Sequence, residues 1–266
     1  MVDYLDRYLR IADIPDETGA VNGLQVENHG WVDHIIAAVD ASQATIDGVV
    51  HSLAEEDGDE GLAGGNHGDT PLVLVHHGLF WDGNQPVTGR RYRRLRALMA
   101  NDIALYAAHI PLDVHPEVGN NAILARDIGL KLSGTFGKYK GIELGVWGEA
   151  HNGIATRQAL LEQLRFQLDL PQPPMLIPGG PAEVRRVGIV TGGASSMIAA
   201  ARDAGIDTFI TGEGPHYTYH DAMEWGVNVI YAGHYATETV GVKALGQHLG
   251  RHFRLLHLFH DHPTGL

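Results

Sequence analysis

The chain has 266 residues and a formal net charge of −13, with 32 acidic residues against 19 Lys and Arg. Hydrophobic residues make up 44% of it, enough for a sizeable core in one large domain or two smaller ones. The negative charge opposes binding to nucleic-acid backbones. Because the sequence contains no cysteine, disulfides and thiolate metal sites are excluded, and any metal must be bound by nitrogen and oxygen.

Nothing in the sequence indicates a membrane protein. No apolar run approaches the ~18–20 residues that a membrane span requires. The N-terminus, Met-Val-Asp-Tyr-Leu-Asp-Arg-Tyr-Leu-Arg, is the start of an amphipathic helix, with acidic residues where a signal peptide needs a basic region. We therefore expect a cytoplasmic protein without membrane association.

In the first half, apolar runs alternate with helix-period segments. The expected elements are a strand at 35–39, a turn and a helix to about residue 56, a strand at 72–75 that ends in His76-His77, a helix at about 89–101 and a strand at 103–108. Residues 55–69, which include His67, are acidic and Gly-rich without periodicity, and this predicts a mobile loop.

The second half repeats this order. The expected elements are a strand at 186–190, a glycine-rich turn at 191–195, a helix at 196–204, a strand at 207–211, a helix at 217–225, a strand at 227–232, a helix from 234 to about 249 and a final strand at 253–259. Alternating strands and helices predict an α/β fold. Chance similarity of two α/β halves is one explanation. We favour a diverged duplication of one βαβαβ unit.

Between the halves, residues 132–147 alternate with glycine punctuation, which predicts a hairpin. Residues 171–181, rich in Pro and Gly, are the natural linker. The expected division is therefore a first α/β half at 1–130, a hairpin and linker region at 131–184, and a second α/β half at 185–266.

Two other segments have more than one interpretation. The basic run Arg90-Arg91-Tyr92-Arg93-Arg94-Leu95-Arg96 is more typical of a solvated helix face or subunit contact than of a phosphate site. The turn Thr191-Gly192-Gly193-Ala194-Ser195 is compatible with a phosphate loop, but it lacks the P-loop lysine and the dinucleotide fingerprint, so a tight turn explains it equally well.

Two distant stretches share a signature: Tyr-Ala-Ala-His-Ile-Pro-Leu-Asp at 106–113 and Tyr-Ala-Gly-His-Tyr-Ala-Thr-Glu at 231–238. Each follows an apolar strand and has a carboxylate four residues after a histidine. On a helix, His234 and Glu238 would share a face and could bind one ion, whereas the side chains of His76 and His77 diverge in an extended backbone and could serve two ions. Bridging carboxylates are usual in two-metal hydrolytic sites.

The candidate residues all lie just beyond expected strand ends, where open α/β sheets form their ligand crevice. They are His76, His77, His109, Asp113, Glu213, His234 and Glu238. Among 17 histidines any single one is more often structural, and we assign the C-terminal His248, His252, His257, His260 and His262 to that class.

Several phrases together resemble the NIF-three-like (YbgI-like) family, whose members are commonly named GTP cyclohydrolase 1 type 2 homologues. The phrases are Asn-Gly-Leu-Gln-Val at 22–26, His-His-Gly-Leu-Phe-Trp at 76–81, Ala-His-Ile-Pro-Leu-Asp at 108–113, His-Pro-Glu-Val-Gly-Asn-Asn at 115–121, Thr-Gly-Gly-Ala at 191–194 and Gly-His-Tyr-Ala-Thr-Glu at 233–238. They follow the family's order over almost the whole chain.

The resemblance implies two related α/β domains with a dinuclear metal centre in the cleft between them. By matching motifs, His76 and Asp113 would bind one ion, His77 and His234 the other, and Glu238 would bridge both. It further implies the compact version of the family, without the large inserted domain, and a homo-oligomer, often a toroidal hexamer.

The first functional hypothesis is a GTP cyclohydrolase-like, metal-dependent hydrolase that acts on a nucleotide or phosphorylated small molecule. His109 would be the acid/base, or a hydrogen-bond partner that orients Asp113, and Glu213 and His216 are candidates for substrate contact. The alternative is a non-enzymatic metal-binding regulatory or interaction protein. Two divalent ions are expected, and the ligand set admits zinc, iron, manganese or nickel.

Overall fold

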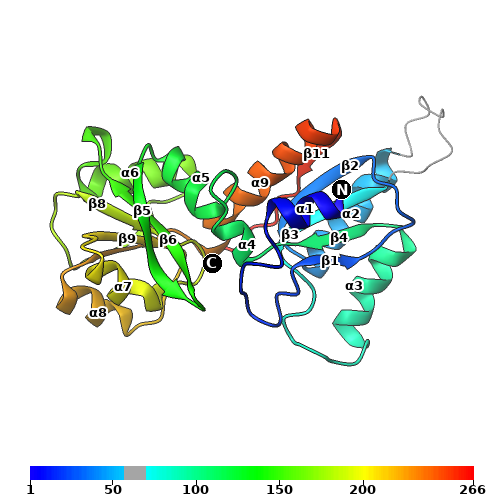
Figure 1. Cartoon of the computed structure of the whole chain (residues 1–266), viewed down its shortest axis with the longest axis horizontal. Helices are drawn as coiled ribbons and strands as arrows, with labels where there is room; N and C mark the ends of the chain where they lie inside the picture. Colours follow the sequence, from blue (N-terminus) through cyan, green and yellow to red (C-terminus); the bar gives the residue numbers. More distant parts are fainter. Residues whose placement is uncertain (57–69) are drawn as a thin grey trace. The chain divides into compact units, whose positions relative to one another are not determined.

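The computed structural model describes residues 1–56 and 70–266, with side chains described except at 54–56 and 152. The chain forms two compact units (Figure 1). Unit 1 comprises Met1–Leu112 and Val242–His262, and unit 2 comprises Asp113–Gly241 and Pro263–Leu266. The mobile loop expected at 55–69 lies almost entirely outside the described residues, and so does His67.

Unit 1 is built on a five-stranded sheet with the strand order β1-β4-β3-β2-β11. Its strands are β1 (Gly23–Val26), β2 (His34–Asp40), β3 (Pro71–His77), β4 (Ala104–Ala107) and β11 (Leu256–Phe259). Its helices are α1 (Val2–Tyr8), α2 (Gln43–Glu56) and α3 (Gly89–Ala100), together with the part of α9 (His234–Phe253) that starts at Val242. The short helix α4 (Ile110–Asp113) follows β4 and crosses the boundary between the units.

Helices cover both faces of this sheet. On one face, α2 and α3 pack against alternate residues of the central strands, among them Ile36, Val73 and Leu105. On the other face, α9 approaches β2 so closely that a Cβ at Gly246 would lie 3.3 Å from the Cβ of Ala37. Burial on both faces explains why β2, β3 and β4 are almost continuously apolar.

Hydrogen bonds connect α1 to the sheet and to α9. The buried Tyr106 hydroxyl of β4 donates to Asp6 Oδ1 at 2.7 Å. Burial raises the pKa of this tyrosine, and the hydrogen bond and charge of Asp6 raise it further. The Tyr4 hydroxyl lies 2.6 Å from His248 Nε2, and the Tyr8 ring stacks on His248 with centroids 4.3 Å apart. His248 is therefore a packing residue, as the sequence predicts.

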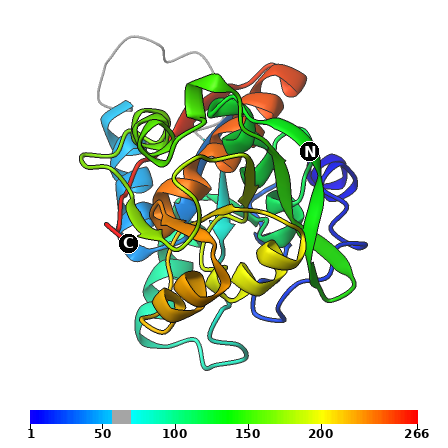
Figure 2. The same ribbon diagram turned by 90° about the vertical axis from the view of Figure 1, so that its left-hand side faces the viewer.

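Unit 2 has a six-stranded sheet with the order β5-β6-β8-β9-β10-β7. Its strands are β5 (Lys131–Tyr139), β6 (Ile142–Glu149), β7 (Met175–Pro178), β8 (Arg186–Ile189), β9 (Thr208–Thr211) and β10 (Asn228–Tyr231). Its helices are α5 (Asn120–Asp127), α6 (Arg157–Gln167), α7 (Ile198–Asp203), α8 (Thr218–Trp225) and the first turns of α9, with short 3₁₀ turns at Asn152–Ile154 and Ser195–Met197. In Figure 2, β5 and β6 form a long green two-stranded ribbon, and α7 and α8 lie side by side.

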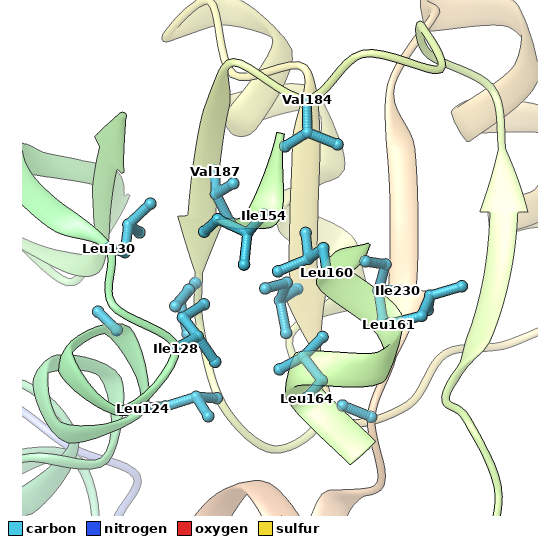
Figure 3. Close-up of a cluster of buried hydrophobic side chains, with 14 of the residues drawn as sticks. Leu124, Ile128, Leu130, Ile154, Leu160, Leu161, Leu164, Val184, Val187 and Ile230 are labelled. Carbon is cyan, nitrogen blue, oxygen red and sulfur yellow. The ribbon is translucent and has the colours of Figure 1, made fainter. Parts of the chain in front are cut away.

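The core of unit 2 has two parts, one on each face of the sheet. Figure 3 shows the first, in which Leu124 of α5 and Leu164 of α6 point toward Val187 of β8 and Ile230 of β10. On the opposite face, α7 and α8 cover Phe209 and Val229. Neighbouring residues of one strand, such as Val229 and Ile230, belong to opposite faces because side chains alternate along a strand.

Both sheets contain the same arrangement of four strands. In unit 1, β1 is antiparallel to β4, and β4, β3 and β2 run parallel. In unit 2, β7 is antiparallel to β10, and β10, β9 and β8 run parallel. The sheets differ beyond these strands, where β11 extends the first and the β6–β5 hairpin extends the second. A common origin of the two halves stays a prediction.

The α/β class, the hairpin and the alternating strands and helices of both halves are confirmed, but the division of the chain differs from the expected one. The hairpin belongs to the second sheet because β6 pairs with β8. Residues 171–181, expected to be a linker, contain the edge strand β7, where proline is tolerated. The last part of α9 and β11 belong to unit 1, since β11 pairs with β2.

No helix among the described residues is both long and apolar enough to span a bilayer.

We expect Leu164→Ala to lower the free energy of unfolding by about 2–5 kcal/mol, because the side chain is 0% exposed and its removal leaves a cavity between α6 and the sheet. Phe166 on the same helix is 78% exposed, and Phe166→Ala should change stability by less than about 0.5 kcal/mol. Urea denaturation followed by circular dichroism measures both. Equal effects of the two substitutions would contradict the packing described for α6.

Candidate metal centre

Polar side chains follow the parallel strands of unit 1 at the edge where these strands end. Asp40 and His77 are the last residues of β2 and β3 and lie opposite each other in the sheet. His76 precedes His77, and His109 comes two residues after β4. Because the carboxyl ends of neighbouring parallel strands share one edge, these residues gather there, as in the ligand crevices of α/β sheets.

Three of these residues, His76, His77 and His109, form what we call the histidine cluster. Each offers one ring nitrogen, and these nitrogens all lie within 4.8 Å of one another. The ring centroids of His76 and His77 are 4.7 Å apart, and those of His76 and His109 are 5.0 Å apart. The cluster could hold a metal ion, and it includes His109, which the family motifs do not count as a ligand.

Each histidine of the cluster has its Nδ1 atom at hydrogen-bond distance from an oxygen. The pairs are His76 with the Ala108 carbonyl at 2.9 Å, His77 with Asp40 Oδ1 at 2.8 Å and His109 with Asp16 Oδ1 at 2.8 Å. Carbonyl and carboxylate oxygens accept, so Nδ1 donates and carries the proton of the neutral ring. Nε2 then keeps a lone pair for a metal ion or a proton, as is usual for metal-binding histidines.

Asp16, in the segment between α1 and β1, is the residue that orients His109. Its second oxygen accepts from the Ile110 backbone amide at 2.9 Å and from Asn22 Nδ2 at 2.8 Å. Burial alone would raise the pKa of Asp16, but the hydrogen bond to His109, the charge of that ring and further hydrogen bonds lower it below its ordinary value. The carboxylate is therefore an acceptor near neutral pH.

In unit 2, His234 and Glu238 lie on the first turn of α9, directly after β10. Gly233 permits this sharp entry because its φ of 91° lies in a region that other residues avoid. His234 Nε2 is 3.2 Å from Glu238 Oε1, and His234 Nδ1 donates to Glu213 Oε1 at 2.8 Å. The expectation that residues four apart on this helix share a face is confirmed.

The interaction with Glu238 makes His234 an unusually basic histidine. A hydrogen bond to Glu238 raises the pKa of His234 to about 9; burial opposes this rise, while the charge of Glu238 and the contact with Glu213 add to it. Because the Glu238 carboxylate is only 2% exposed, the two facing acceptor atoms require a proton or a metal cation between them. This donor pair suits a divalent ion.

The Thr191–Gly192 turn after β8 lies against the two carboxylates of unit 2 that the family motifs count as ligands, Asp113 and Glu238. Thr191 Oγ1 donates to Asp113 Oδ1 at 3.3 Å, and Asn120 Nδ2 donates to the same oxygen at 2.8 Å. Gly192 has a φ of 68°, and a Cβ at this position would overlap with Glu238 Oε1. The backbone of this glycine-rich turn thus lies close to a carboxylate. This supports the tight-turn interpretation of the segment over the phosphate-loop interpretation.

The structure assigns different surroundings to the other predicted residues. The hydrogen-bond partner of His109 Nδ1 is Asp16, not the Asp113 carboxylate that we considered. Glu213, expected at the substrate, positions His234. His216 is exposed and lies edge-on to His220, with ring centroids 5.8 Å apart. Substrate contact by Glu213 and His216 stays a prediction.

Sequence reasoning missed Asp16, Asp40 and Trp81. Asp16 and Asp40 are far from their histidines along the chain, and the period of a strand or helix does not point to them. Trp81 is 40% exposed, and its ring lies edge-on to His109 and His77 with centroids 4.8 and 5.8 Å away. The only signal for Trp81 was its place at the end of the His-His-Gly-Leu-Phe-Trp phrase at 76–81.

The sequence profile of the Duf34/NIF3 (NGG1p interacting factor 3) family matches residues 65–263. The chain belongs to this family. A Deinococcus radiodurans protein named GTP cyclohydrolase 1 type 2 homolog is 39% identical over 268 residues, which cover 100% of this chain and 93% of that protein. The corresponding Pseudomonas aeruginosa protein of the same name is 41% identical and covers 99% of this chain and 96% of its own.

Solved structures of similar proteins share the fold over the whole chain. Protein ybgI, described as a structural-genomics target of unknown function, is 37% identical with a TM-score of 0.84 and covers 100% of this chain and 98% of its own. A Thermus thermophilus protein, TTHA1606, is 41% identical with a TM-score of 0.82 and the same coverage. The NIF3-family resemblance inferred from the motifs is confirmed.

We expect Gly192→Ala to weaken metal binding about tenfold or more, because the new methyl group displaces the Glu238 carboxylate. Gly193→Ala is the matched control, since a Cβ there meets Glu213 Oε1 at an ordinary 3.6 Å. Metal content after dialysis, measured by plasma mass spectrometry beside the melting temperature, separates a local effect from unfolding. Equal metal retention by both variants would show that the turn does not position Glu238.

Asp40→Ala should weaken metal affinity about 10–100-fold, because His77 loses the oxygen that orients its ring. Asp47 on α2 is exposed and accepts a hydrogen bond from Gln43, so Asp47→Ala removes the same charge away from the centre. Competition with a chromophoric chelator gives both affinities. If the two variants bind metal equally well, the orientation of His77 does not depend on Asp40.

Proposed function

We propose that this NIF3-family protein is a dinuclear metal-dependent hydrolase. The observation that carries the proposal is the common orientation of four histidines: His76, His77, His109 and His234 each have Nδ1 at an oxygen acceptor, which leaves Nε2 for a cation or a proton. His29 and His34 make the same kind of contact elsewhere in unit 1. What distinguishes the four is that they lie at or just after the carboxyl ends of strands and belong to groups that could hold a metal ion. The chemistry of the donor set, imidazole nitrogens and carboxylates without thiolate, fits zinc, iron, manganese or nickel.

The ligand assignment follows the family motifs. His76 and Asp113 would bind one ion, His77 and His234 the other, and Glu238 would bridge the two. When bound, two divalent ions lower the pKa of water and polarise the bond to be hydrolysed. The surrounding residues support these roles: Asp40 orients His77, Glu213 orients His234, and the Thr191 hydroxyl contacts Asp113.

His109 is the candidate acid/base of this proposal. Because Asp16 accepts the Nδ1 proton of His109 in a hydrogen bond, Nε2 is the nitrogen that would take a proton from the reacting group and later return it, as in other carboxylate–histidine pairs. Trp81, which is 40% exposed and lies edge-on to His109, is the candidate aromatic contact for a planar substrate group in this proposal.

The substrate class in this proposal is a nucleotide or phosphorylated small molecule, hydrolysed in a cyclohydrolase-like reaction. Curated relatives from Deinococcus radiodurans and Pseudomonas aeruginosa are named GTP cyclohydrolase 1 type 2 homologs. For this chain, the names of these relatives indicate only which compounds to screen first, namely purine nucleotides and phosphoesters.

Glu238→Ala should remove most bound metal and lower hydrolysis at least about 100-fold, because the side chain is buried against His234 and would supply a ligand oxygen to the ions. Glu224→Ala, at an exposed position of α8, removes the same charge and should match the wild type. The measurements are metal stoichiometry and turnover of a nucleotide and phosphoester panel with each of the four metals.

Two outcomes would contradict the proposal. Full metal content in Glu238→Ala would refute the ligand assignment. Metal binding that Glu238→Ala abolishes, without hydrolysis in the wild type across metals and pH, would instead identify a metal-binding regulatory or interaction protein.

A further inference from the structure

Helix α3 carries an unusual concentration of positive charge for this acidic chain. Five arginines occur among residues 90–96, while the whole chain has 19 Lys and Arg against 32 Asp and Glu. In the part of the chain that the structure describes, Asp82 is the carboxylate that pairs with this helix. It contacts Arg90 at 3.3 Å and also forms an ion pair with Arg91.

Arg91 shows what a structural arginine looks like on this helix. It is 6% exposed, and its guanidinium donates to the Gln85 carbonyl at 3.1 Å and to the Gly83 carbonyl at 2.6 Å, in addition to pairing with Asp82. The charge of Arg91 is therefore neutralised, and both of its Nη atoms donate within the protein. Its Nε, like that of Arg94, is buried without a hydrogen-bond partner among the described residues, so the ion pair with Asp82 is what distinguishes Arg91.

Arg94 has a different environment. Its Nη1 donates to the Ala41 carbonyl at 3.0 Å, while its Nε is buried without a hydrogen-bond partner among the described residues. Within that part of the chain it forms no ion pair with a carboxylate. Burial lowers the pKa of Arg94, and the neighbouring charges of Arg90 and Arg91 add to this while Asp82 opposes it.

This environment is unfavourable for the protein alone. A guanidinium has five N–H donors, and among the described residues the half-buried Arg94 donates to a neutral carbonyl, that of Ala41. Partial burial of a cation that no carboxylate pairs with directly costs free energy, and a like charge four residues away on a helix adds to that cost. The charge of Asp82 opposes these two effects. An anion bound at Arg94 would offset both.

The position of Arg94 connects it to the candidate metal centre within unit 1. Ala41, which accepts from Arg94, is the residue after Asp40, and its backbone amide donates to the His77 carbonyl at 2.8 Å. The Asp40 carboxylate in turn holds the His77 ring. The Arg94 guanidinium therefore contacts the turn after β2, which is at the same edge of the sheet as the histidine cluster.

A second path along the chain leads to the same place. Asp82, which pairs with Arg90 and Arg91, directly follows Trp81, whose ring lies against His109 and His77. The turn at Ala41 also begins α2, where Ser42 Oγ accepts from the Thr45 amide at 3.0 Å. The partial positive charge of this helix start adds to that of Arg94.

From these contacts we propose that Arg94, with Arg90 beside it, binds a phosphate group, and that this group belongs to the substrate of the candidate centre. Arginine suits the role because its planar guanidinium can donate two parallel hydrogen bonds to phosphate oxygens. The link to the substrate rests on the proposed hydrolase function, whereas the phosphate site itself depends only on residues of unit 1.

Isothermal titration calorimetry at constant ionic strength tests the site with three probes: inorganic phosphate, guanosine 5′-monophosphate and guanosine. The proteins are the wild type, Arg94→Gln and Arg96→Gln, the last an exposed position of the same helix with the same change of charge. Each is measured metal-loaded and after treatment with a chelator. We expect Arg94→Gln to weaken both phosphate-containing probes about tenfold or more, and Arg96→Gln to weaken them less than about twofold.

The two preparations separate this inference from the hydrolase proposal. Phosphate binding that survives chelation and requires Arg94 supports the site even if no hydrolysis is found. Weaker binding of the nucleotide than of inorganic phosphate would overturn the assignment to a substrate group. Loss of all phosphate binding on chelation, or equal weakening by both substitutions, would overturn the site itself. Arg94→Lys, which keeps the charge, replaces Arg94→Gln if the latter fails to fold, and should retain part of the affinity.

Discussion

The candidate centre depends on one type of interaction, the hydrogen bond from a histidine Nδ1 to an oxygen acceptor. The same bond occurs at His76, His77, His109 and His234, with a carbonyl in one case and carboxylates in the other three. Each acceptor fixes both the direction of a ring and the nitrogen that carries its proton. Without these acceptors the rings could rotate and exchange tautomers, and the ring nitrogens at these strand ends would not point in fixed directions.

The sheets bring the acceptors and the histidines together. Parallel pairing places Asp40 opposite His77, and the apolar residues of β2, β3 and β4 are buried on both faces, which specifies their register. In unit 2, the same order of parallel strands places Glu213 after β9 and His234 after β10. Gly192 and Gly233 then allow the backbone to approach a carboxylate and to turn sharply into α9. The packing of apolar side chains thus stabilises the positions at which polar groups converge.

Much of this arrangement could be predicted from local sequence. Apolar runs such as 72–75 predicted the central strands, and the His-x₃-acid signature pointed to the strand ends after which His109 and His234 lie. The antiparallel edge strands β1 and β7 were missed because Gly23 and Gln25 interrupt the apolar pattern of β1, and β7 lies within the Pro- and Gly-rich stretch 171–181. Asp16 was missed because its partner His109 lies 93 residues away, and only tertiary structure brings them together. Arg94 and Arg91 look alike in the sequence, and their different roles depend on where Asp82 lies.

The hydrogen bond between Asp16 and His109 also links the orientation of the His109 ring to the segment between α1 and β1. Asp16 belongs to a segment between α1 and β1 that has neither helix nor strand, and such segments open at a lower free energy than the core. The segment is closed by the bonds of Asp16 to His109 and to the Ile110 amide and by Asn22, whose side chain accepts from the His109 amide at 2.7 Å. The direction of this imidazole, and the nitrogen that carries its proton, therefore depend on a segment that belongs to no helix or strand.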